Sequence, residues 1–400
     1  MKKIKLLFII SNINIGGPQK SLLALLDKLD YNLFDVSIYV LKPGGRLKKY
    51  YNKKVKFLET DELVTAATLP SENTISYLKT FIKKRKFKMF IGALRALLNH
   101  ILLRKNMNQE RQKFWEKNAD AIPRLNDYYD LAFGILGLST YFMLDAVEAN
   151  QKFHWIRSDT RILNRDTKID ASYYKKLDGA LSVSKECAEI FIEMYPFMKE
   201  RIEVFYNYIP ESFYKRLDYD ETLMKTEDNY IKLVTVTRLD PLKGIEMAIE
   251  SCKYLVDRGF KIKWFILGDG KFRAEIEKMI VEKGIKDSFI LLGFQLNTLS
   301  FIKDADIFVH PSRTEGKSNA VDEAKFVGKP IVVTNYDTVA EQIEHGVTGL
   351  ICSMSGEEIA NSIEKIINNN DLRENLMKNC KYHRDGTTDA SKFLVDLRRT

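Results

Sequence analysis

Residues 307–330 read IFVHPSRTEGKSNAVDEAKFVGKP, and this stretch decides the fold. The opening run IFVH predicts a buried strand, which the Pro-Ser pair then ends. The residues from about 318 to 326 predict a helix that ends before the Gly-Lys-Pro triplet. A loop between such a strand and such a helix lies at the carboxyl end of a parallel sheet, where open α/β folds bind their ligands.

Two glutamates, Glu315 and Glu323, stand eight positions apart in this stretch. We expect Glu315 in the loop and Glu323 about two turns into the helix, on the side of the ligand. The helix start between them offers backbone N–H groups and a positive dipole end, which suit an anion. Carboxylates beside an anion site suit a ligand with hydroxyls and phosphates, such as a nucleotide sugar. The alternative is a solvated helix face that carries two glutamates by chance.

A second strand end lies in the stretch VTVTRLDPLKGIE at 234–246. The β-branched run predicts a strand that ends at Arg238, followed by a turn and by a helix that starts near Lys243 and Gly244. A forked guanidinium and a compact ammonium at one strand end can hold a diphosphate. The alternative is a surface arginine and lysine without a partner.

Three more stretches show strand ends of the same kind. WFILGDGKFRAEI at 264–276 predicts a strand, a Gly-Asp-Gly turn and a helix, and FILLGF at 289–294 predicts a strand whose end can present backbone groups to a base. Near the amino terminus, KIKLLFIIS predicts a first strand before the pair Gly16 and Gly17 and a helix from Gln19. A plain strand-to-helix turn explains a pair of glycines there.

These motifs come in an order that resembles one family. RLDPLKG, LGDG, LLGF, HPSRTEGKSNAVDEA and GKPIVVT follow one another within about 100 residues. The order resembles the carboxyl-terminal half of the retaining glycosyltransferases of family 4, of the bacterial surface-polysaccharide type, in which the glutamates form an E-x7-E motif. GALSVSKECAEIF and RIEVFYNYIP resemble that family's strand-helix-strand run and its turn into the interdomain linker. The likeness covers most of the chain except roughly residues 60–125.

The resemblance implies an α/β protein of GT-B fold, with two Rossmann-like domains whose parallel sheets face each other across an interdomain cleft. It implies transfer of a hexosyl unit from a nucleoside-diphosphate sugar, with retention of anomeric configuration and without a metal ion. Arg238 and Lys243 would hold the donor diphosphate and offset the charge of the leaving group. Glu323 would accept hydrogen bonds from the ribose, and Glu315 from the transferred sugar. The other donor-binding positions would be Gly16, Gly17, Phe294, Gly316, Lys317, Ser318 and Asn319.

One position departs from the family pattern. Many relatives carry a histidine near the reaction centre, and in the matching stretch FHWIRSDTR that place is taken by Arg157. His154 lies three residues earlier and on a strand would face the opposite side, so we expect it to be a packed histidine. Arg157 would instead bind a phosphate of the donor or the acceptor. The loss of the histidine leaves open a non-catalytic nucleotide-sugar-binding protein. An epimerase or a phosphorylase of the same fold is a further rival.

The length and the alternation of strands and helices predict two domains. The acceptor domain would span residues 1–209, with a basic helical insertion at about 72–118. Pro210 and the charged stretch after it predict a linker at 210–229. The donor domain would span 230–380, and the residues 381–400 would form a helix that crosses back to the first domain.

The insertion holds an uneven charge. Between Asn73 and Gln109 there are nine Lys or Arg and no Asp or Glu, against a formal net charge of +9 for the whole chain. Apolar side chains recur there at helical intervals, as at Tyr77, Phe81, Phe87, Phe90, Leu94, Leu97, Leu98, Ile101 and Leu102. Basic residues beside an apolar face suit an anionic membrane surface, and therefore a lipid-linked saccharide acceptor. The alternatives are a solvated basic face and nucleic acid, which we disfavour because no nucleic-acid module surrounds the segment.

Composition bounds the remaining chemistry. The four cysteines lie far apart without metal-like spacing, so we expect reduced thiols in a cytoplasmic protein. The first apolar run is short and predicts a strand, not a signal peptide, and no run is long enough to span a membrane. The Asp-x-Asp pairs at 304–306 and 218–220 predict a helix end and a linker, not a metal site. We therefore expect no cofactor besides the donor, and a location at the inner face of the cell membrane.

Overall fold

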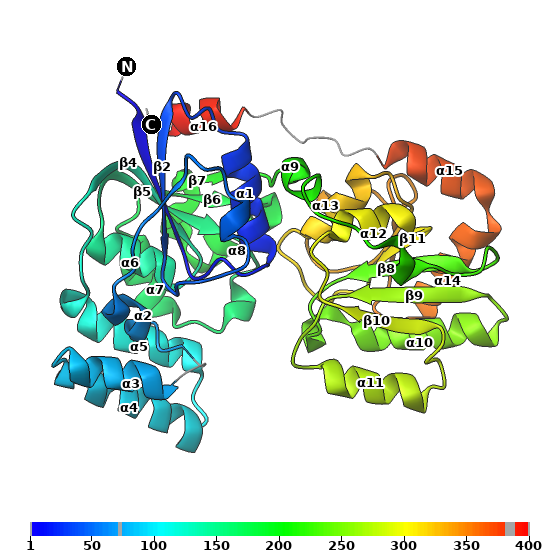
Figure 1. Ribbon diagram of the computed structural model, residues 1–400, viewed down its shortest axis with the longest axis horizontal. Coiled ribbons are helices and arrows are strands. Elements are labelled where there is room, and N and C mark those ends of the chain that lie inside the picture. Colours follow the sequence, from blue (N-terminus) through cyan, green and yellow to red (C-terminus); the bar gives the residue numbers. More distant parts are fainter. Residues whose placement is uncertain (1, 71–73, 381–388, 399–400) are drawn as a thin grey trace. The chain divides into compact units, whose positions relative to one another are not determined.

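The computed structural model describes residues 2–70, 74–380 and 389–398. The chain forms two compact units, one of Met1–Asn207 with Gly386–Thr400 and one of Tyr208–Asp385. The division falls between Asn207 and Tyr208, close to the boundary that the sequence predicts after residue 209. Each unit is an α/β domain with an all-parallel sheet (Figure 1).

The first unit holds a seven-stranded sheet in the order β3-β2-β1-β4-β5-β6-β7. Its inner strands are near-continuous apolar runs, because helices cover both faces of a parallel sheet. The rings of Phe8, Phe133 and Phe153 stack across β1, β4 and β5 at 4.9 and 5.6 Å between centroids. The strands are β1 (Ile4–Ile10), β2 (Phe34–Val40), β3 (Lys56–Phe57), β4 (Tyr128–Ile135), β5 (Glu148–Ile156), β6 (Gly179–Ser182) and β7 (Ile202–Val204).

The helices of this unit include one that returns from the far end of the chain. The amide of Asp30 donates to Ser391 Oγ at 2.9 Å, and Arg398 pairs with Asp130 at 3.0 Å, so the last helix packs on the first unit. The helices are α1 (Gly17–Asp27), α2 (Glu62–Ala67), α3 (Thr74–Lys83), α4 (Phe87–Leu102), α5 (Met107–Asn118), α6 (Leu138–Ala146), α7 (Thr167–Tyr174), α8 (Lys185–Met194) and α16 (Ala390–Leu397).

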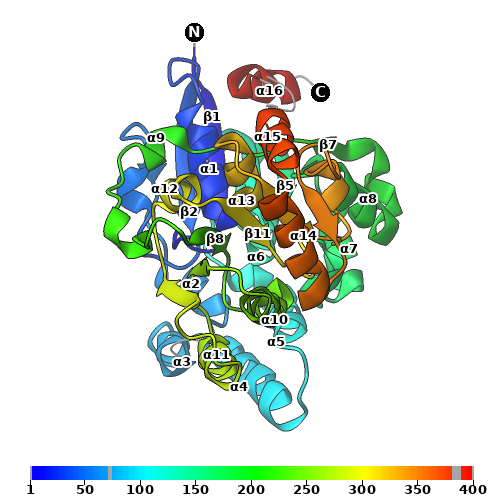
Figure 2. The same cartoon turned by 90° about the vertical axis from the view of Figure 1, so that its right-hand side faces the viewer.

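The predicted insertion forms α3, α4 and α5, which lie together at one end of the first unit (Figures 1 and 2). The expected single apolar face is wrong. Tyr77 and Phe81 are buried, whereas Phe87 and Ile101 are 59% and 67% exposed. The buried side of α4 is made by small or flexible residues such as Ala93, because α4 approaches α5 closely. The apolar residues of α4 therefore divide between an inner and an outer face.

The second unit holds a six-stranded sheet in the order β10-β9-β8-β11-β12-β13. Successive residues alternate between its two cores: Trp264 belongs to the core with α10 and α14, and Phe265 to the core with α12 and α13. The strands are β8 (Ile231–Val236), β9 (Ile262–Leu267), β10 (Phe289–Gly293), β11 (Ile307–His310), β12 (Ile331–Thr334) and β13 (Leu350–Cys352). The helices are α9 (Glu211–Tyr214), α10 (Ile245–Asp257), α11 (Arg273–Glu282), α12 (Thr298–Asp304), α13 (Asn319–Phe326), α14 (Gly356–Asn368) and α15 (Asn370–Asn379).

The stretch expected as a linker, 210–229, is counted within the second unit. Phe213 and Tyr214 of α9 and Met224 further on are buried there. Asn297 at the start of α12 donates to the carbonyls of Leu217 and Asp218 at 3.1 and 3.3 Å. The sequence did not predict that these residues are buried, because the stretch is mostly charged and its few apolar residues are spaced too widely to show a period.

Candidate active site

Two loops meet at the carboxyl edge of the second sheet. β8 and β11 are parallel neighbours, so the loop after Val236 and the loop after His310 leave the sheet at the same edge. The backbone ties them together, because the amide of Arg313 donates to the carbonyl of Leu242 at 2.9 Å. Arg238 and Lys243 lie in the first loop and Glu315 in the second, as the sequence predicts for an edge where ligands bind.

Gly244 allows this close meeting of loops, and Gly268 allows a similar approach between the loops after β9 and β8. Gly244 has φ +62°, and a Cβ there would lie 2.0 Å from the carbonyl oxygen of Pro311. Gly268 has φ +144°, and its Cβ would lie 1.7 Å from the carbonyl oxygen of Thr237. Any side chain at either position would separate the loops, since contacts this short are not tolerated by backbone atoms. The glycines of the LKG and LGD motifs thus shape the edge of the sheet.

Lys243, Glu315 and His310 form a cluster at this edge. Lys243 Nζ lies 2.7 Å from Glu315 Oε1, and His310 Nε2 lies 2.9 Å from the same oxygen. Lys243 Nζ also lies 3.4 Å from the carbonyl oxygen of Thr314. The Lys243 and Glu315 side chains are 17% and 15% exposed, whereas His310 is buried. The lysine expected at the phosphates and the glutamate expected at the sugar therefore touch.

The cluster keeps Glu315 ionised. Burial by itself would raise its pKa, but the hydrogen bond from His310 and the charge of Lys243 outweigh burial and lower the pKa from 4.5 to about 2. His310 Nδ1 is buried and has no hydrogen-bond partner among the described residues. A charged carboxylate that two donors hold in place can accept hydrogen bonds from hydroxyls of a ligand.

Glu323 is the fifth residue of α13 and is only 2% exposed. Tyr214 of α9 donates a short hydrogen bond to its Oε1, and Thr298 donates to its Oε2 at 2.8 Å. Burial, and next the charge of Glu323, raise the pKa of Tyr214 well above 10, so its hydroxyl keeps its proton. The two hydroxyls fix the orientation of the carboxylate. The sequence places Glu323 on the ligand side, but it does not show this support.

The start of α13 differs from the open anion site that the sequence suggests. Ser318 is the N-cap residue, and its Oγ accepts from the amide of Val321 at 3.4 Å. Gln342 accepts from the amide of Ser318 at 2.8 Å and donates to its carbonyl at 2.9 Å. Two of the N–H groups are thus used within the protein. Gly316 is buried, and Lys317 and Asn319 are half-buried beside the cap.

Other expected donor residues stand apart from the cluster. Arg238 is 69% exposed, and its ion pair with Asp240 spans 3.8 Å. Phe294 follows β10 and is 41% exposed. Among the described residues no group of three or more His, Cys, Asp or Glu is placed to hold a metal ion. Asp304 ends α12 and accepts instead from Tyr219 and Lys232 at 3.0 and 2.9 Å.

In the first unit, the expected glycine loop begins α1. Gly16 is its N-cap residue with an extended φ of −171°, which any residue adopts. A Cβ on Gly16 would lie 2.6 Å from Gln19 Oε1, and Gln19 in turn donates to the carbonyl of Asn12 at 3.1 Å. A glycine is therefore explained locally by the path of the Gln19 side chain. Gly17 is the first residue of the helix, before Pro18.

Arg157 follows β5 and is enclosed by neutral groups. Its Nη1 donates to Asn207 Oδ1 and its Nη2 to Ser21 Oγ, both at 2.6 Å, and its guanidinium lies 5.0 Å from the Trp155 ring centroid. Its Nε has no hydrogen-bond partner among the described residues. Burial lowers the pKa of Arg157 to about 9, so the side chain is still charged at pH 7. A half-buried cation whose hydrogen-bond partners are neutral can attract an anion.

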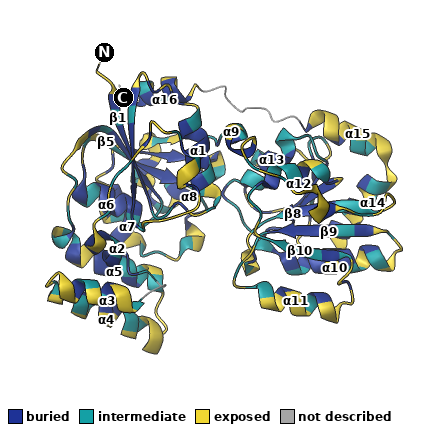
Figure 3. Ribbon diagram, in the orientation of Figure 1, coloured by how far each residue is buried: buried dark blue, intermediate teal, exposed yellow. Residues whose placement is uncertain are grey.

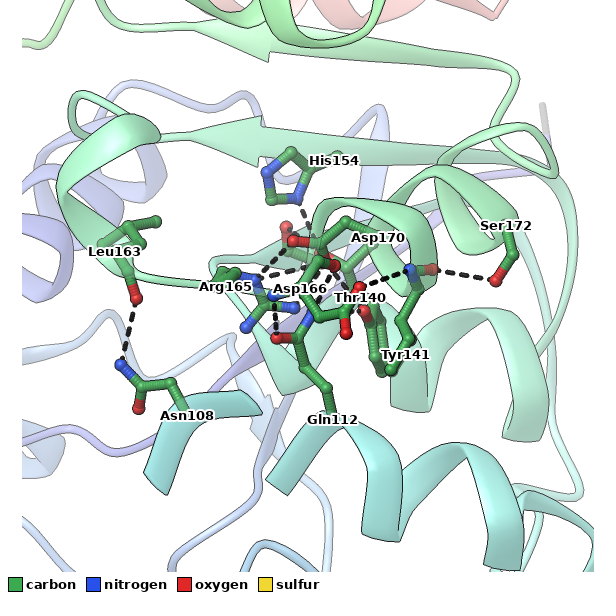
Figure 4. A network of polar contacts seen from close by, with 12 residues as sticks. Asn108, Gln112, Thr140, Tyr141, His154, Leu163, Arg165, Asp166, Asp170 and Ser172 are labelled. Carbon is green, nitrogen blue, oxygen red and sulfur yellow. Dashed lines mark hydrogen bonds and ion pairs between the residues drawn. The ribbon is translucent and has the colours of Figure 1, made fainter. Parts of the chain in front are cut away.

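His154 is packed, as the sequence predicts. Its ring stacks on Tyr174 and Phe191 at 5.0 and 5.7 Å, and its Nδ1 lies 2.7 Å from Thr140 Oγ1. Burial lowers its pKa to about 4, so the imidazole is neutral at pH 7. Figure 4 shows it at the edge of a polar network around Asp170. This histidine therefore serves the packing of the first unit.

Four contributors to the candidate site escaped the sequence analysis: Tyr214, Thr298, His310 and Gln342. His310 could have been found, because it is the last residue of a predicted strand and therefore stands at the ligand edge. Tyr214 lies in a stretch with linker composition. Thr298 and Gln342 carry no local signal, since they are common polar residues whose value comes only from the side chain they face.

Comparisons with known proteins match part of the chain by sequence and nearly all of it by fold. Residues 222–383 match the family model described as glycosyl transferases group 1. Alpha-D-kanosaminyltransferase of Streptomyces kanamyceticus is 31% identical over 36% of this chain and 38% of its own length. The amylovoran biosynthesis glycosyltransferase AmsK of Erwinia amylovora is 34% identical over 30% of this chain and 31% of its length. CapM of Staphylococcus aureus, a capsular polysaccharide biosynthesis glycosyltransferase, is 30% identical over 39% of this chain and 43% of its own length.

The chain thus spans less than half the length of these three relatives in the matched segments. Solved structures cover far more of it. TarM matches 100% of this chain and 99% of its own at a TM-score of 0.69 and 14% identity. The structure of Anabaena HepE in complex with UDP-glucose covers 99% of each chain, at a TM-score of 0.66 and 15% sequence identity. These likenesses confirm the expected GT-B type of fold, two Rossmann-like domains, and the second carries the group 1 glycosyl transferase match.

Proposed function

We propose that this protein is a retaining, metal-independent glycosyltransferase of the family 4 type. It moves a hexosyl unit from a nucleoside-diphosphate sugar to a lipid-linked saccharide during synthesis of a surface polysaccharide. The match of residues 222–383 to group 1 glycosyl transferases supports the transferase, and the relatives AmsK and CapM, by their names, support the polysaccharide. The structure of HepE in complex with UDP-glucose supports a nucleotide-sugar donor.

The observation that carries the proposal is the cluster of Lys243, Glu315 and His310. A charged ammonium 2.7 Å from a charged carboxylate at a sheet edge offers a cation to a phosphate and an acceptor to a sugar hydroxyl side by side. Bond cleavage leaves negative charge on the diphosphate, and a fixed cation stabilises that charge in the transition state. Lys243 and Arg238 perform this role, and no metal ion is needed. His310 holds Glu315 in place for the sugar.

The remaining donor residues follow from the same arrangement. Glu323, which Tyr214 and Thr298 orient, accepts hydrogen bonds from the ribose hydroxyls, because each carboxylate oxygen can accept more than one hydrogen bond. The loop of Gly316, Lys317, Ser318 and Asn319 contacts the sugar and phosphates, Phe294 borders the base, and Gly16 and Gly17 border the phosphates.

Arg157 is the proposed anion-binding residue of the first unit, for a phosphate of donor or acceptor. Its side chain is half-buried beside Ser21, Asn207 and Trp155, and its Nε lacks a partner among the described residues. The same residue supports a second candidate function, a nucleotide-sugar-binding protein without turnover. In that case Arg157 would stand where a catalytic histidine is missing.

We further propose that the enzyme works in the cytoplasm, at the inner face of the cell membrane. The basic insertion supports this location, because a lipid-linked acceptor must be reached at an anionic surface. The nine Lys and Arg between Asn73 and Gln109 are not offset by any Asp or Glu in that interval.

The test is release of free nucleoside diphosphate from a panel of nucleotide sugars, with and without lipid-linked acceptors. A transferase releases the diphosphate faster when the acceptor is present, and the anomeric proton coupling of the product shows whether configuration is retained. The variant Lys243→Ala should lose this release. Its matched control is Lys278→Ala, which removes an exposed lysine of α11. Tight binding of a nucleotide sugar without acceptor-dependent release across the panel would establish the non-catalytic binder.

A further inference from the structure

The helices α3 and α4 expose an unusual amount of apolar surface. Among the described residues nineteen large apolar side chains are exposed, and nine of them lie in this short part of the chain. Figure 3 shows both helices largely in the colour of exposed residues. We call these nine side chains the apolar row; they are Ile75, Ile82, Phe87, Ile91, Leu94, Leu98, Ile101, Leu102 and Leu103. An apolar surface of this extent marks an interaction site.

The row on α4 is a single stripe. Each residue turns a helix by about 100°, so positions 87, 91, 94, 98 and 101 fall on one side of it. The opposite side holds Met89, Ala93 and Ala96, all buried, and faces α5, where Phe114 lies close to Gly92. The inner face of α4 therefore completes the packing of the first unit. The outer stripe faces away from that packing, and its residues are 40% to 67% exposed.

The packing below the stripe is firm. Asn99 donates to Glu110 Oε2 at 2.7 Å, and the rings of Phe81 and Phe114 lie 5.9 Å apart, so α3, α4 and α5 form one block. Gln112 of α5 joins this block to the rest of the unit through Tyr141 and the amide of Asp166, at 3.0 and 2.7 Å (Figure 4). The apolar row is thus presented on a fixed support.

The charged residues of α4 and of the turn between α3 and α4 are basic. Lys88 and Arg95 lie on α4 beside the stripe and are exposed, and Lys84 and Arg85 are exposed in the turn between the helices. Lys83, at the end of α3, is also basic, but its charge is paired with that of Glu62 at 3.3 Å. Apolar side chains with a cationic border match the interface of an anionic bilayer, where the apolar groups enter the acyl boundary and the cations meet phosphates.

We propose that α3 and α4 insert the apolar row into the interface of an anionic lipid bilayer, lying in its plane. No helix in the described parts of the chain is long and apolar enough to cross a membrane, so the contact is a shallow one. A second copy of this chain fits less well, because the two basic borders would repel each other. The inference rests on the proposed function and extends its acceptor side, since it gives attachment by insertion and not by charge alone.

Flotation of the full chain with vesicles of phosphatidylcholine and phosphatidylglycerol tests the insertion. Charge attraction is screened by salt, whereas insertion of apolar groups is not, so we expect binding in 0.1 M salt and a fraction that survives 1 M salt. In the triple variant Ile91→Gln, Leu98→Gln, Ile101→Gln the salt-resistant fraction disappears, and partitioning falls on the order of tenfold or more. The matched control Leu33→Gln, Leu223→Gln, Val281→Gln removes exposed apolar groups elsewhere and floats normally.

A second variant separates the two contributions. Lys84→Gln, Lys88→Gln, Arg95→Gln should float poorly in low salt and keep its salt-resistant fraction. Thermal unfolding checks that each variant is folded, and titration with UDP and other nucleotides scores the donor site independently, so the proposed function and the insertion can fail separately. Unchanged high-salt flotation of the apolar variant overturns insertion. A dimer in solution that the apolar variant abolishes, without flotation of the original chain, would assign the row to a second copy.

Discussion

Two buried ion pairs, Arg165–Asp170 in the first unit and Lys243–Glu315 in the second, differ in how completely they are enclosed. Arg165 and Asp170 are 9% and 0% exposed, whereas Lys243 and Glu315 are 17% and 15% exposed. Asp170 accepts from Arg165 through two nitrogens and from Tyr141 at 2.7 Å (Figure 4). It also accepts from Tyr195 at 3.4 Å. Both of its oxygens are thus occupied inside the unit.

The second pair is left partly open at a sheet edge. Glu315 takes two donors, His310 and Lys243, and the lysine is reachable from solvent. The difference distinguishes an ion pair that stabilises the fold from one that can bind a ligand. A saturated pair holds helices together, and an unsaturated pair at the carboxyl edge of a parallel sheet is available to a ligand.

The largest effect is expected for Asp170→Asn. Breaking a buried, saturated pair leaves Arg165 as an uncompensated charge, so the free energy of unfolding should fall by roughly 3–5 kcal/mol. Urea unfolding measures the loss. The matched control is Glu148→Gln, which removes an exposed pair with Arg124 and should change stability by about 1 kcal/mol or less. Equal losses in both variants would contradict the view that the buried Arg165–Asp170 pair supports the fold more than an exposed pair does.

Lys243→Ala should reduce turnover more than stability. Removing a charge-assisted phosphate contact should raise the barrier by roughly 2–4 kcal/mol, which is a loss of about thirtyfold to a thousandfold in kcat/KM. Arg238→Ala should act in the same direction. Nucleoside diphosphate release gives the rates, with Lys278→Ala as the control. Turnover that is normal in both site variants would remove the diphosphate assignment.

The open pair should also show in the pH dependence of stability. The folded pKa of Glu315 lies near 2, below its ordinary 4.5, so its ionised form stabilises the fold above pH 4.5 and that contribution is lost as pH falls toward 2. At about 1.4 kcal/mol per pKa unit it amounts to at most about 3 kcal/mol. The stability difference between the original chain and Glu315→Gln should therefore shrink as the pH is lowered from about 5 to about 3. Glu364→Gln, which removes a carboxylate paired with Arg258, is the matched control.

A smaller effect is expected for Tyr214→Phe. Loss of the hydroxyl that orients Glu323 should weaken binding of free nucleoside diphosphate by about 1 kcal/mol, or roughly fivefold. Tyr219→Phe is the matched control, because it removes a tyrosine hydroxyl from Asp304 in the same unit. Isothermal titration compares the two. An equal change in both would mean that Tyr214 supports the fold and not the nucleotide site.

No effect is expected from chelation. The proposed site uses Lys243 and Arg238 where other transferases use a divalent cation, so turnover should be the same with and without EDTA. Loss of turnover that manganese restores would show a metal requirement and would move the leaving-group role away from these two residues.

The sequence indicated that Lys243 and Glu315 lie at one sheet edge, but it did not indicate the pair of Arg165 and Asp170. Lys243 and Glu315 stand at fixed distances after predicted strand ends, and parallel neighbours bring such ends together. Tyr141, Arg165 and Asp170 lie on separate elements with no common period, so only packing shows that they meet. The same limit hid Tyr214, which supports Glu323 from a stretch with the composition of a linker. Side-chain partners that are distant in sequence leave no mark on local patterns.

The sequence was sufficient to predict the two α/β domains, the edge that carries Lys243 and Glu315, and the basic segment between Asn73 and Gln109, which holds no Asp or Glu. Periodicity, turn residues and charge counts are local properties, and they suffice for these conclusions. Tertiary structure alone decided which apolar residues of the insertion face outward. Tyr77 and Phe81 on α3 and Phe87 at the start of α4 are aromatic residues of one basic segment of the sequence. Only packing within the block of α3, α4 and α5 buries the first two and leaves Phe87 exposed. Burial depends on what packs against a helix, and that partner is chosen by the fold.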